Sequence, residues 1–183
     1  MNLTLSGMAR PRGLILWTFI AISIISLPSM LANALGLRVN TTRSLPMGIY
    51  AVTNDAFCEL IEYCPEGNAA KESKNRGYRN AGSCPDGAEP LIKPVVAREG
   101  DVVEFSLRGI SVNGNLLKNT APLPLDGAGR PLIHWKFGVY RVALGDVWVA
   151  STYNYGSYDS RYFGPVRISS IRNQLRPIWT LKQ

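Results

Sequence analysis

The sequence predicts a mainly β domain with antiparallel strands, preceded by one N-terminal transmembrane helix. Two observations lead to this fold class. Residues 13–37, GLILWTFIAISIISLPSMLANALGL, are uncharged and mostly apolar. In the remainder, short runs rich in Val, Ile, Tyr and Phe alternate with Gly, Asn and Asp turn signals, and few stretches carry the 3.6-residue periodicity of a helix. A length of 183 residues suits one domain of ordinary size behind the apolar segment.

The apolar segment is long enough to cross a bilayer, since a helix of about 20 residues spans the hydrocarbon core. Pro28 would kink such a helix without preventing it from spanning. A cleaved signal peptide is the alternative, because Arg10 and Arg12 resemble its charged n-region and residues 32–34 (ANA) match a cleavage site. We expect a retained anchor, because the apolar run is longer than a typical signal-peptide core.

The charge balance is basic, with a formal net charge of +7 and a pI near 9.5. Such a balance suits an anionic membrane surface or nucleic acid. The basic residues are scattered, however, and neither a dense basic run nor an aromatic-interleaved basic stripe occurs. We therefore expect no nucleic-acid partner.

Three cysteines occur, Cys58, Cys64 and Cys84, and they form neither a CxxC motif nor a Cys/His cluster, so we expect no metal. Cys64 and Cys84 each precede a proline and bracket a polar stretch, like the two ends of a disulfide-closed loop. Such a bond would stabilise the fold by roughly 3 kcal/mol and would need an oxidising compartment such as the periplasm. Cys58 is then unpaired, and we interpret it as a small buried residue rather than a nucleophile.

The chain is thereby divided into three parts: a cytoplasmic N-terminus at 1–12, a transmembrane anchor at 13–37 and a periplasmic domain at 38–183. The arginines on either side of the anchor leave its orientation nearly balanced. The cysteines decide in favour of a periplasmic domain, which places the protein at a bacterial inner membrane with a single span.

Within the domain we expect strands in seven runs: IYAVTN, LIKPVVARE, DVVEFSL, ISV before Asn113-Gly114, VYRVAL, DVWVAST and FGPVRI. Only Ala69–Arg79 has the character of a short helix, inside the loop between the cysteines. Residues 120–137 hold three prolines and two glycines and predict an extended loop, of the kind that often forms a wall of a substrate groove.

A candidate nucleophile, Ser44, lies just beyond the apolar segment in NTTRSLPMGIY. A serine needs a base, because its hydroxyl must lose a proton as it attacks. His134 is the one histidine, and no supporting pattern surrounds it. Lys93 stands alone among apolar residues in LIKPVV, where burial would lower its pKa toward the range of about 7 to 8 that a base requires. The alternative is a strand lysine that extends to water.

A second polar cluster, SYDSRYFGP at residues 157–165, contains Ser157, Asp159, Ser160 and Arg161 within five positions. A solvated turn would account for the serine and the aspartate. The arginine two residues after the aspartate, between aromatic residues, indicates a partly buried ion pair, which supports geometry more than stability.

These motifs together resemble the type I signal peptidase family. They are an apolar span, a serine with a hydroxyl residue two before it and a proline two after it, a strand lysine leading to Gly-Asp, and SxDSRxFGP. RVNTTRSLPMGIY, the CP...NRGY...CP loop, LIKPVVA and SYDSRYFGPV are similar to the TraF-type branch, which matures conjugative pilins. The resemblance covers residues 37–171.

The resemblance implies a role for each matching residue. Ser44 would be the acylating nucleophile and Lys93 its general base. Thr42 would join the Ser44 backbone N–H in an oxyanion hole. Ser157 would orient the lysine, and Asp159 would form an ion pair with Arg161.

In TraF-type enzymes the aspartate matching Asp159 also counts as part of the catalytic set. Two departures from general signal peptidases favour the specialised branch: Pro94 follows the lysine, and STYNYG (residues 151–156) replaces a GDN-type segment.

The expected function is that of a membrane-anchored serine endopeptidase with a Ser/Lys dyad, which processes prepilin for plasmid transfer and works beside the conjugative type IV secretion apparatus. Whether the pilin is hydrolysed or cyclised is left open. A general type I signal peptidase is the alternative among enzymes, and a non-catalytic periplasmic scaffold of a transfer channel is the alternative outside them. We expect no cofactor, since serine acyl transfer needs none.

Overall fold

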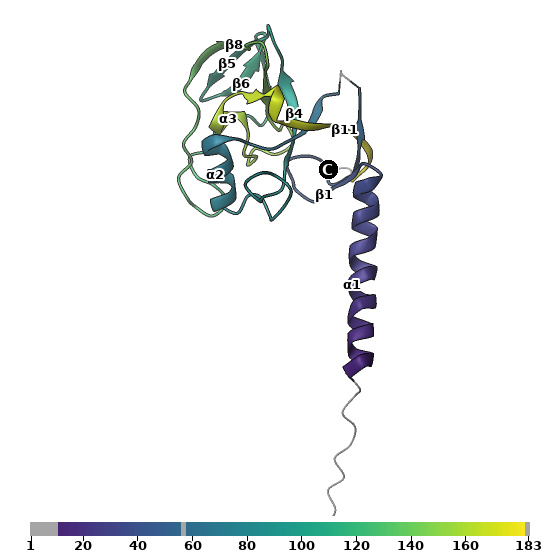
Figure 1. The fold of residues 1–183 in the computed structure, drawn as a ribbon. Coiled ribbons are helices and arrows are strands. Elements are labelled where there is room, and N and C mark those ends of the chain that lie inside the picture. Colours follow the sequence, from purple (N-terminus) through teal and green to yellow (C-terminus); the bar gives the residue numbers. More distant parts are fainter. Residues whose placement is uncertain (1–10, 56–57, 182–183) are drawn as a thin grey trace, which may run out of the picture. The chain divides into compact units, whose positions relative to one another are not determined.

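The computed structural model describes residues 11–55 and 58–181, and the chain forms two compact units, Met1–Arg38 and Val39–Gln183 (Figure 1). The described part of the first unit contains the 24-residue helix α1 (Pro11–Ala34). Among the described residues, no helix combines the length and hydropathy needed to cross a membrane. The anchor at 13–37 stays a prediction, and most of the predicted cytoplasmic segment 1–12 lies outside the described residues.

The larger sheet has seven strands, in the order β1-β2-β11-β3-β4-β9-β10. In that order their bounds are Leu37–Asn40, Gly48–Thr53, Ile171–Thr180, Leu60–Tyr63, Leu91–Ala97, Asp146–Val149 and Val166–Arg167. The pairs from β2 to β10 are antiparallel, and Ile61 of β3 lies opposite Lys93 of β4. This register fixes the candidate base near the middle of the sheet.

The smaller sheet has four antiparallel strands, in the order β7-β6-β5-β8. Their bounds are Asn115–Leu116, Gly109–Val112, Val102–Ser106 and Gly138–Arg141. Asn113 and Gly114 connect β6 to β7, and both have positive φ, 50° and 84°. A tight hairpin turn of this kind favours Asn-Gly, because few other residues adopt positive φ without strain.

The described helical segments of the second unit are short: α2 (Gly67–Asn75), α3 (Ser160–Phe163) and the 3₁₀ turn η1 (Ile168–Ser170). A disulfide joins Cys64 to Cys84, with their Cα atoms 5.6 Å apart, and α2 lies within the loop that it closes. Helix α2 contacts α3, so the disulfide-closed loop reaches the SYDSRYFGP segment.

Apolar side chains from both sheets form one shared core cluster. Phe105 and Ile110 of the small sheet pack with Trp148 of the large sheet, and all three are at most 1% exposed. A second cluster contains Leu45, Tyr50 and Leu175, with Ile92 packed against it. This second cluster underlies the loop that carries Ser44, because Leu45 is the next residue.

The prediction of a mainly β, antiparallel domain is confirmed. Each predicted run contributes a strand, but FGPVRI contributes only Val166–Arg167, since Phe163 ends α3. The predicted helix at 69–79 was wrong in its bounds, because α2 ends at Asn75 and Gly77 has a positive φ of 70°. The predicted elements did not include β1, β3, β7, β11 or α3.

Candidate active site

Ser44 lies in the loop between β1 and β2, and this loop is fixed on both sides of the serine. Asn40, 5% exposed, accepts a hydrogen bond from the Thr42 backbone N–H (3.1 Å) and donates from its amide to the Leu45 carbonyl (3.2 Å). The side chain of Leu45 is buried. Ser44 itself is half-buried, so its hydroxyl is held in place yet accessible.

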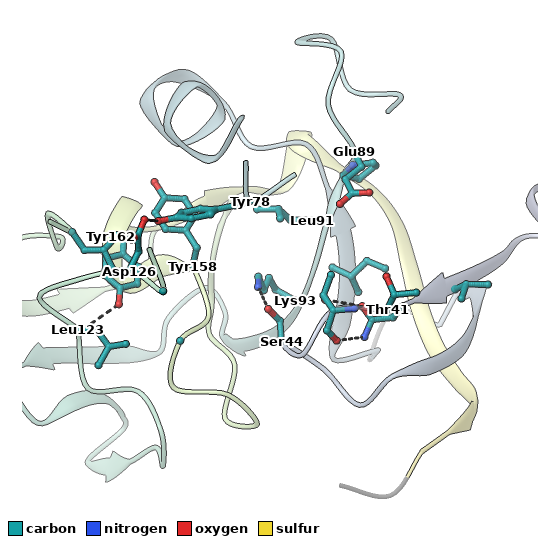
Figure 2. Close-up of a pocket in the computed structure, with 18 residues that line it drawn as sticks. Thr41, Ser44, Tyr78, Glu89, Leu91, Lys93, Leu123, Asp126, Tyr158 and Tyr162 are labelled. Carbon is teal, nitrogen blue, oxygen red and sulfur yellow. Dashed lines mark hydrogen bonds between the residues drawn. The ribbon is translucent and has the colours of Figure 1, made fainter. Parts of the chain in front are cut away.

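Lys93 of β4 is 3% exposed and donates two hydrogen bonds through Nζ. One reaches Ser44 Oγ at 2.6 Å and the other reaches Ser157 Oγ at 2.8 Å. Figure 2 shows the first of these bonds at the centre of the pocket. Three residues from distant parts of the sequence are thus brought together.

Burial lowers the pKa of Lys93 from its usual 10.5 to about 8. The cause is the loss of water around the ammonium, which disfavours the charged form. The carboxylate of Asp159 acts in the opposite direction, and the guanidinium of Arg161 again lowers the pKa. A neutral amine is therefore populated near neutral pH.

Asp159 and Arg161 are completely buried and form an ion pair with 2.7 Å between Arg161 Nε and Asp159 Oδ1. Asp159 also caps α3, because its side chain accepts from the Arg161 backbone N–H. Arg161 Nη2 donates to the Ser157 carbonyl at 2.6 Å. The pair therefore supports the serine that contacts Lys93. Within the described residues, no hydrogen bond joins the pair to Lys93 itself.

The Thr42 hydroxyl donates to Asn40 Oδ1 at 2.8 Å. A hydroxyl has a single proton to donate. For Thr42 to take part in an oxyanion hole, its hydroxyl must rotate away from Asn40 when substrate binds. The oxyanion role of Thr42 stays a prediction.

A cavity of about 300 Å³ opens beside Ser44 and Lys93. Loop 120–137 contributes four of its lining residues: Leu123, Asp126, Gly127 and Leu132. In Figure 2, Tyr78, Tyr158 and Tyr162 gather on one side of the Lys93–Ser44 pair, and Glu89 and Thr41 lie on the other. The loop thus forms a wall of the pocket, as expected for a substrate groove.

The wall is held by Asp126. Its Oδ2 accepts from Tyr78 (2.6 Å), from Arg130 Nε (2.8 Å) and from Arg76 Nη1 (3.2 Å). Tyr78 and Arg76 come from the disulfide-closed loop, so this acid joins that loop to loop 120–137. Tyr162 of α3 also holds loop 120–137, because the Tyr162 hydroxyl accepts a hydrogen bond from the Leu123 backbone N–H.

The predicted site residues did not include Asn40, Ser151, Tyr78 or Asp126. Ser151 is buried, and its hydroxyl donates to the Ser44 carbonyl at 2.6 Å. A signal for it was present, because Ser151 begins the STYNYG segment that departs from the general signal peptidases. Tyr78 lies in the NRGY motif and Asp126 in the predicted loop 120–137, but nothing in the sequence pairs them, since their contact depends on the tertiary fold.

His134 lies apart from this arrangement, stacked on Phe137 with ring centroids 4.1 Å apart. Its Nδ1 is 2.6 Å from the Trp135 carbonyl.

The half-buried Cys58 carries a free thiol that donates to the Leu175 carbonyl. Across residues 11–55 and 58–181, no three His, Cys, Asp or Glu side chains gather as a metal site would need.

Residues 13–180 match the profile of the family described as "Signal peptidase, peptidase S26". The chain belongs to this family. The resemblance inferred from the motifs is therefore confirmed, and membership supports the activity of a serine peptidase.

Curated relatives bear the same name in different bacteria. The plasmid transfer protein TraF of Escherichia coli is 38% identical over 151 residues, which cover 80% of this chain and 84% of the relative. The probable conjugal transfer protein TraF of Sinorhizobium fredii is 36% identical over 150 residues, covering 79% of this chain and 78% of the relative.

Among solved structures, signal peptidase I of Enterococcus faecalis is 18% identical and covers 69% of this chain and 100% of its own. Its TM-score of 0.37 is low, so the family assignment rests on the sequence.

Proposed function

We propose that this protein is a serine endopeptidase with a Ser44/Lys93 dyad that processes the precursor of a conjugative pilin. The observation that carries this proposal is the 2.6 Å hydrogen bond from a buried Lys93 Nζ to Ser44 Oγ. The domain at 38–183 would work in the periplasm, anchored to the bacterial inner membrane through residues 13–37.

The first step needs a neutral lysine. With a pKa of about 8, roughly one Lys93 in ten is neutral at pH 7, whereas an ordinary pKa of 10.5 would leave about one in three thousand. Neutral Lys93 accepts the Ser44 proton as Oγ attacks the scissile carbonyl. Ser157 holds the amine in line with Ser44, because it bonds the same Nζ.

The tetrahedral intermediate carries an oxyanion, which the Ser44 backbone N–H and a rotated Thr42 hydroxyl would stabilise. As the peptide C–N bond breaks, the Lys93 ammonium returns its proton to the leaving amine. The N-terminal part of the substrate then remains as an ester on Ser44 Oγ. Water, or the amino terminus of the same pilin, completes the reaction by attacking this ester.

Cyclisation requires that the amine outcompetes water. A well-oriented intramolecular amine reaches effective molarities of about 10⁵ M or more, so positioning alone is sufficient. Tyr158 and loop 120–137 line the pocket beside Ser44, where the amine would have to be held.

The role in conjugation is supported by the relatives, which carry the names plasmid transfer and conjugal transfer protein TraF. The periplasmic location is supported by the Cys64–Cys84 disulfide, because such bonds persist in oxidising compartments. The inner membrane and the transfer apparatus are the partners that we propose besides prepilin.

The test is mass spectrometry of the pilin, co-expressed with the wild-type protein or with Ser44→Ala. We expect a product shorter than prepilin with the wild type alone, and one further water lost if the product is cyclic. The same pilin mass in both samples would contradict the proposal and favour a transfer-channel scaffold. Cleavage of many unrelated exported precursors would instead favour a general signal peptidase.

A further inference from the structure

We propose that Ser151 is a positioning residue for acyl transfer, which fixes the backbone of the nucleophile through its hydroxyl and ties that backbone to the Asp159–Arg161 pair. This inference rests on the proposed function, because it assigns a role within the same site. It also assigns a role to the STYNYG segment, which differs from the GDN-type segment of general signal peptidases and begins with Ser151.

The hydroxyl of Ser151 has only one direction in which to donate. Its Oγ accepts from the backbone N–H groups of Tyr153 (3.2 Å) and Asn154 (3.1 Å), which occupy both of its acceptor positions. Its proton is directed at the Ser44 carbonyl, 2.6 Å away, which can only accept. The Ser151 hydroxyl is therefore held in a single orientation, with its proton directed at the Ser44 carbonyl.

This link restrains Ser44 from the C-terminal side. The carbonyl of Ser44 shares a rigid plane with the backbone nitrogen of Leu45, so holding that oxygen restrains ψ of Ser44. On the N-terminal side, Asn40 holds the Thr42 backbone N–H. With both sides held, the direction of the Ser44 Cα–Cβ bond, and hence the approach of Oγ to substrate, is set.

The buried ion pair then acts on both members of the dyad. Asp159 Oδ2 accepts from the Ser151 backbone N–H at 3.1 Å, and Ser151 holds Ser44. Arg161 Nη2 donates to the Ser157 carbonyl, and Ser157 Oγ receives a bond from Lys93. One pair of opposite charges thereby sets the distance between nucleophile and base without contacting substrate.

Ser160 offers a matched control. It is also fully buried, and its Oγ accepts from the Val149 backbone N–H at 2.9 Å. Ser160→Ala removes the acceptor of the Val149 N–H, as Ser151→Ala removes the acceptor of the Tyr153 and Asn154 N–H groups. No hydrogen bond from the Ser160 side chain, however, reaches Ser44, Lys93 or Ser157 within the described chain. A difference between the two variants therefore reports positioning rather than general loss of stability.

The experiment measures kcat and KM of the full chain in detergent, on a peptide spanning the pilin cleavage site, per folded molecule and from pH 6 to 10. For Ser151→Ala we expect kcat to fall about 10- to 100-fold, since a displaced reacting group costs rates of this order. KM should change little, and the acid limb of the pH profile should stay in place because Lys93 keeps its surroundings. Ser160→Ala should keep kcat within about twofold, and Ser151→Thr should restore part of the loss.

A Ser151→Ala kcat per folded molecule within about twofold of the wild type would overturn the inference, as would an equal loss in Ser160→Ala. If Ser151→Ala does not fold, Ser151→Cys is measured in its place, because a thiol is a weak donor. Wild-type and Ser44→Ala proteins are assayed beside them. A wild type that leaves the peptide intact contradicts the proposed function itself, whereas an active wild type with an unaffected Ser151 variant contradicts only this inference.

Discussion

Lys93 Nζ lies 2.6 Å from Ser44 Oγ, although the two residues are 49 positions apart in the sequence. Ser44 lies in the loop before β2 and Lys93 lies on β4, and strands β11 and β3 separate β2 from β4 in the sheet. Leu45 bridges this gap by packing on Leu175 of β11, in a cluster that also contacts Ile92 of β4. The contact between Lys93 and Ser44 therefore depends on the buried cluster beneath the loop.

Replacing Lys93 by methionine should abolish peptidase activity without destabilising the fold at pH 7. An ammonium whose pKa is lowered from 10.5 to about 8 costs the folded state about 3 kcal/mol below pH 8. Methionine fills a similar volume without that cost. Thermal unfolding should show a Tm at or above that of the wild type, and Lys118→Met, at an exposed position, should keep full activity.

The difference in unfolding free energy between the wild type and Lys93→Met should depend on pH in a defined direction. Between about pH 8 and 10.5, the unfolded chain binds the Lys93 proton and the folded protein has released it, so wild-type stability rises with pH in this window. The advantage of Lys93→Met should therefore shrink as pH increases from 8 to 10. Denaturant unfolding at both values checks this, and an advantage that grows with pH would contradict the lowered pKa.

The rate of peptide cleavage should rise with pH along an acid limb whose apparent pKa is about 8. The sign follows from the mechanism, since only the neutral amine accepts the Ser44 proton. A profile of kcat/KM against pH measures it in the free enzyme. A limb well below pH 8 would contradict the assignment of Lys93 as the base.

Asp159→Asn should destabilise the domain strongly, by about 3 to 5 kcal/mol, because it leaves the Arg161 guanidinium buried without its counter-charge. Urea unfolding of the variant and of wild type gives the difference. Asp146→Asn, at a partly exposed site, serves as control and should change stability by less than about 0.5 kcal/mol. A loss of similar size in both variants would show that the ion pair has no special structural role.

Asp126→Ala should raise KM several-fold and leave kcat nearly unchanged. The carboxylate joins Tyr78 and Arg130 across two loops, and its removal loosens a pocket wall without touching Ser44 or Lys93. Steady-state kinetics on the pilin peptide separates the two constants. A fall in kcat at constant KM would place this wall in the chemistry instead of in substrate binding.

Much of the fold class was legible in the sequence, because β-branched runs and turn residues act locally. The Asn113-Gly114 hairpin needs only its own backbone preference. Strand β11 was missed, since Pro177 and several polar residues break the apolar alternation, and its strand conformation comes from pairing with β2 and β3.

The candidate site likewise contains residues that could be recognised from the sequence and contacts that only the structure reveals. Ser44 and Lys93 were recognisable because the motifs around them resemble those of the type I signal peptidase family. The residues alone left open a strand lysine that extends to water. Asp126 and Tyr78 are 48 positions apart, and their contact exists only after two loops fold together. Ser151 was visible as part of a departure from general signal peptidases, but its bond to Ser44 spans 107 positions and required the structure.

The most direct test of the dyad is the intact mass of the protein, quenched in acid during turnover of the pilin peptide. We expect an adduct equal to the N-terminal product less one water, located on Ser44 by digestion, and absent from both Ser44→Ala and Lys93→Met. Cleavage that continues in Ser44→Ala, or an adduct on another residue, would contradict the account.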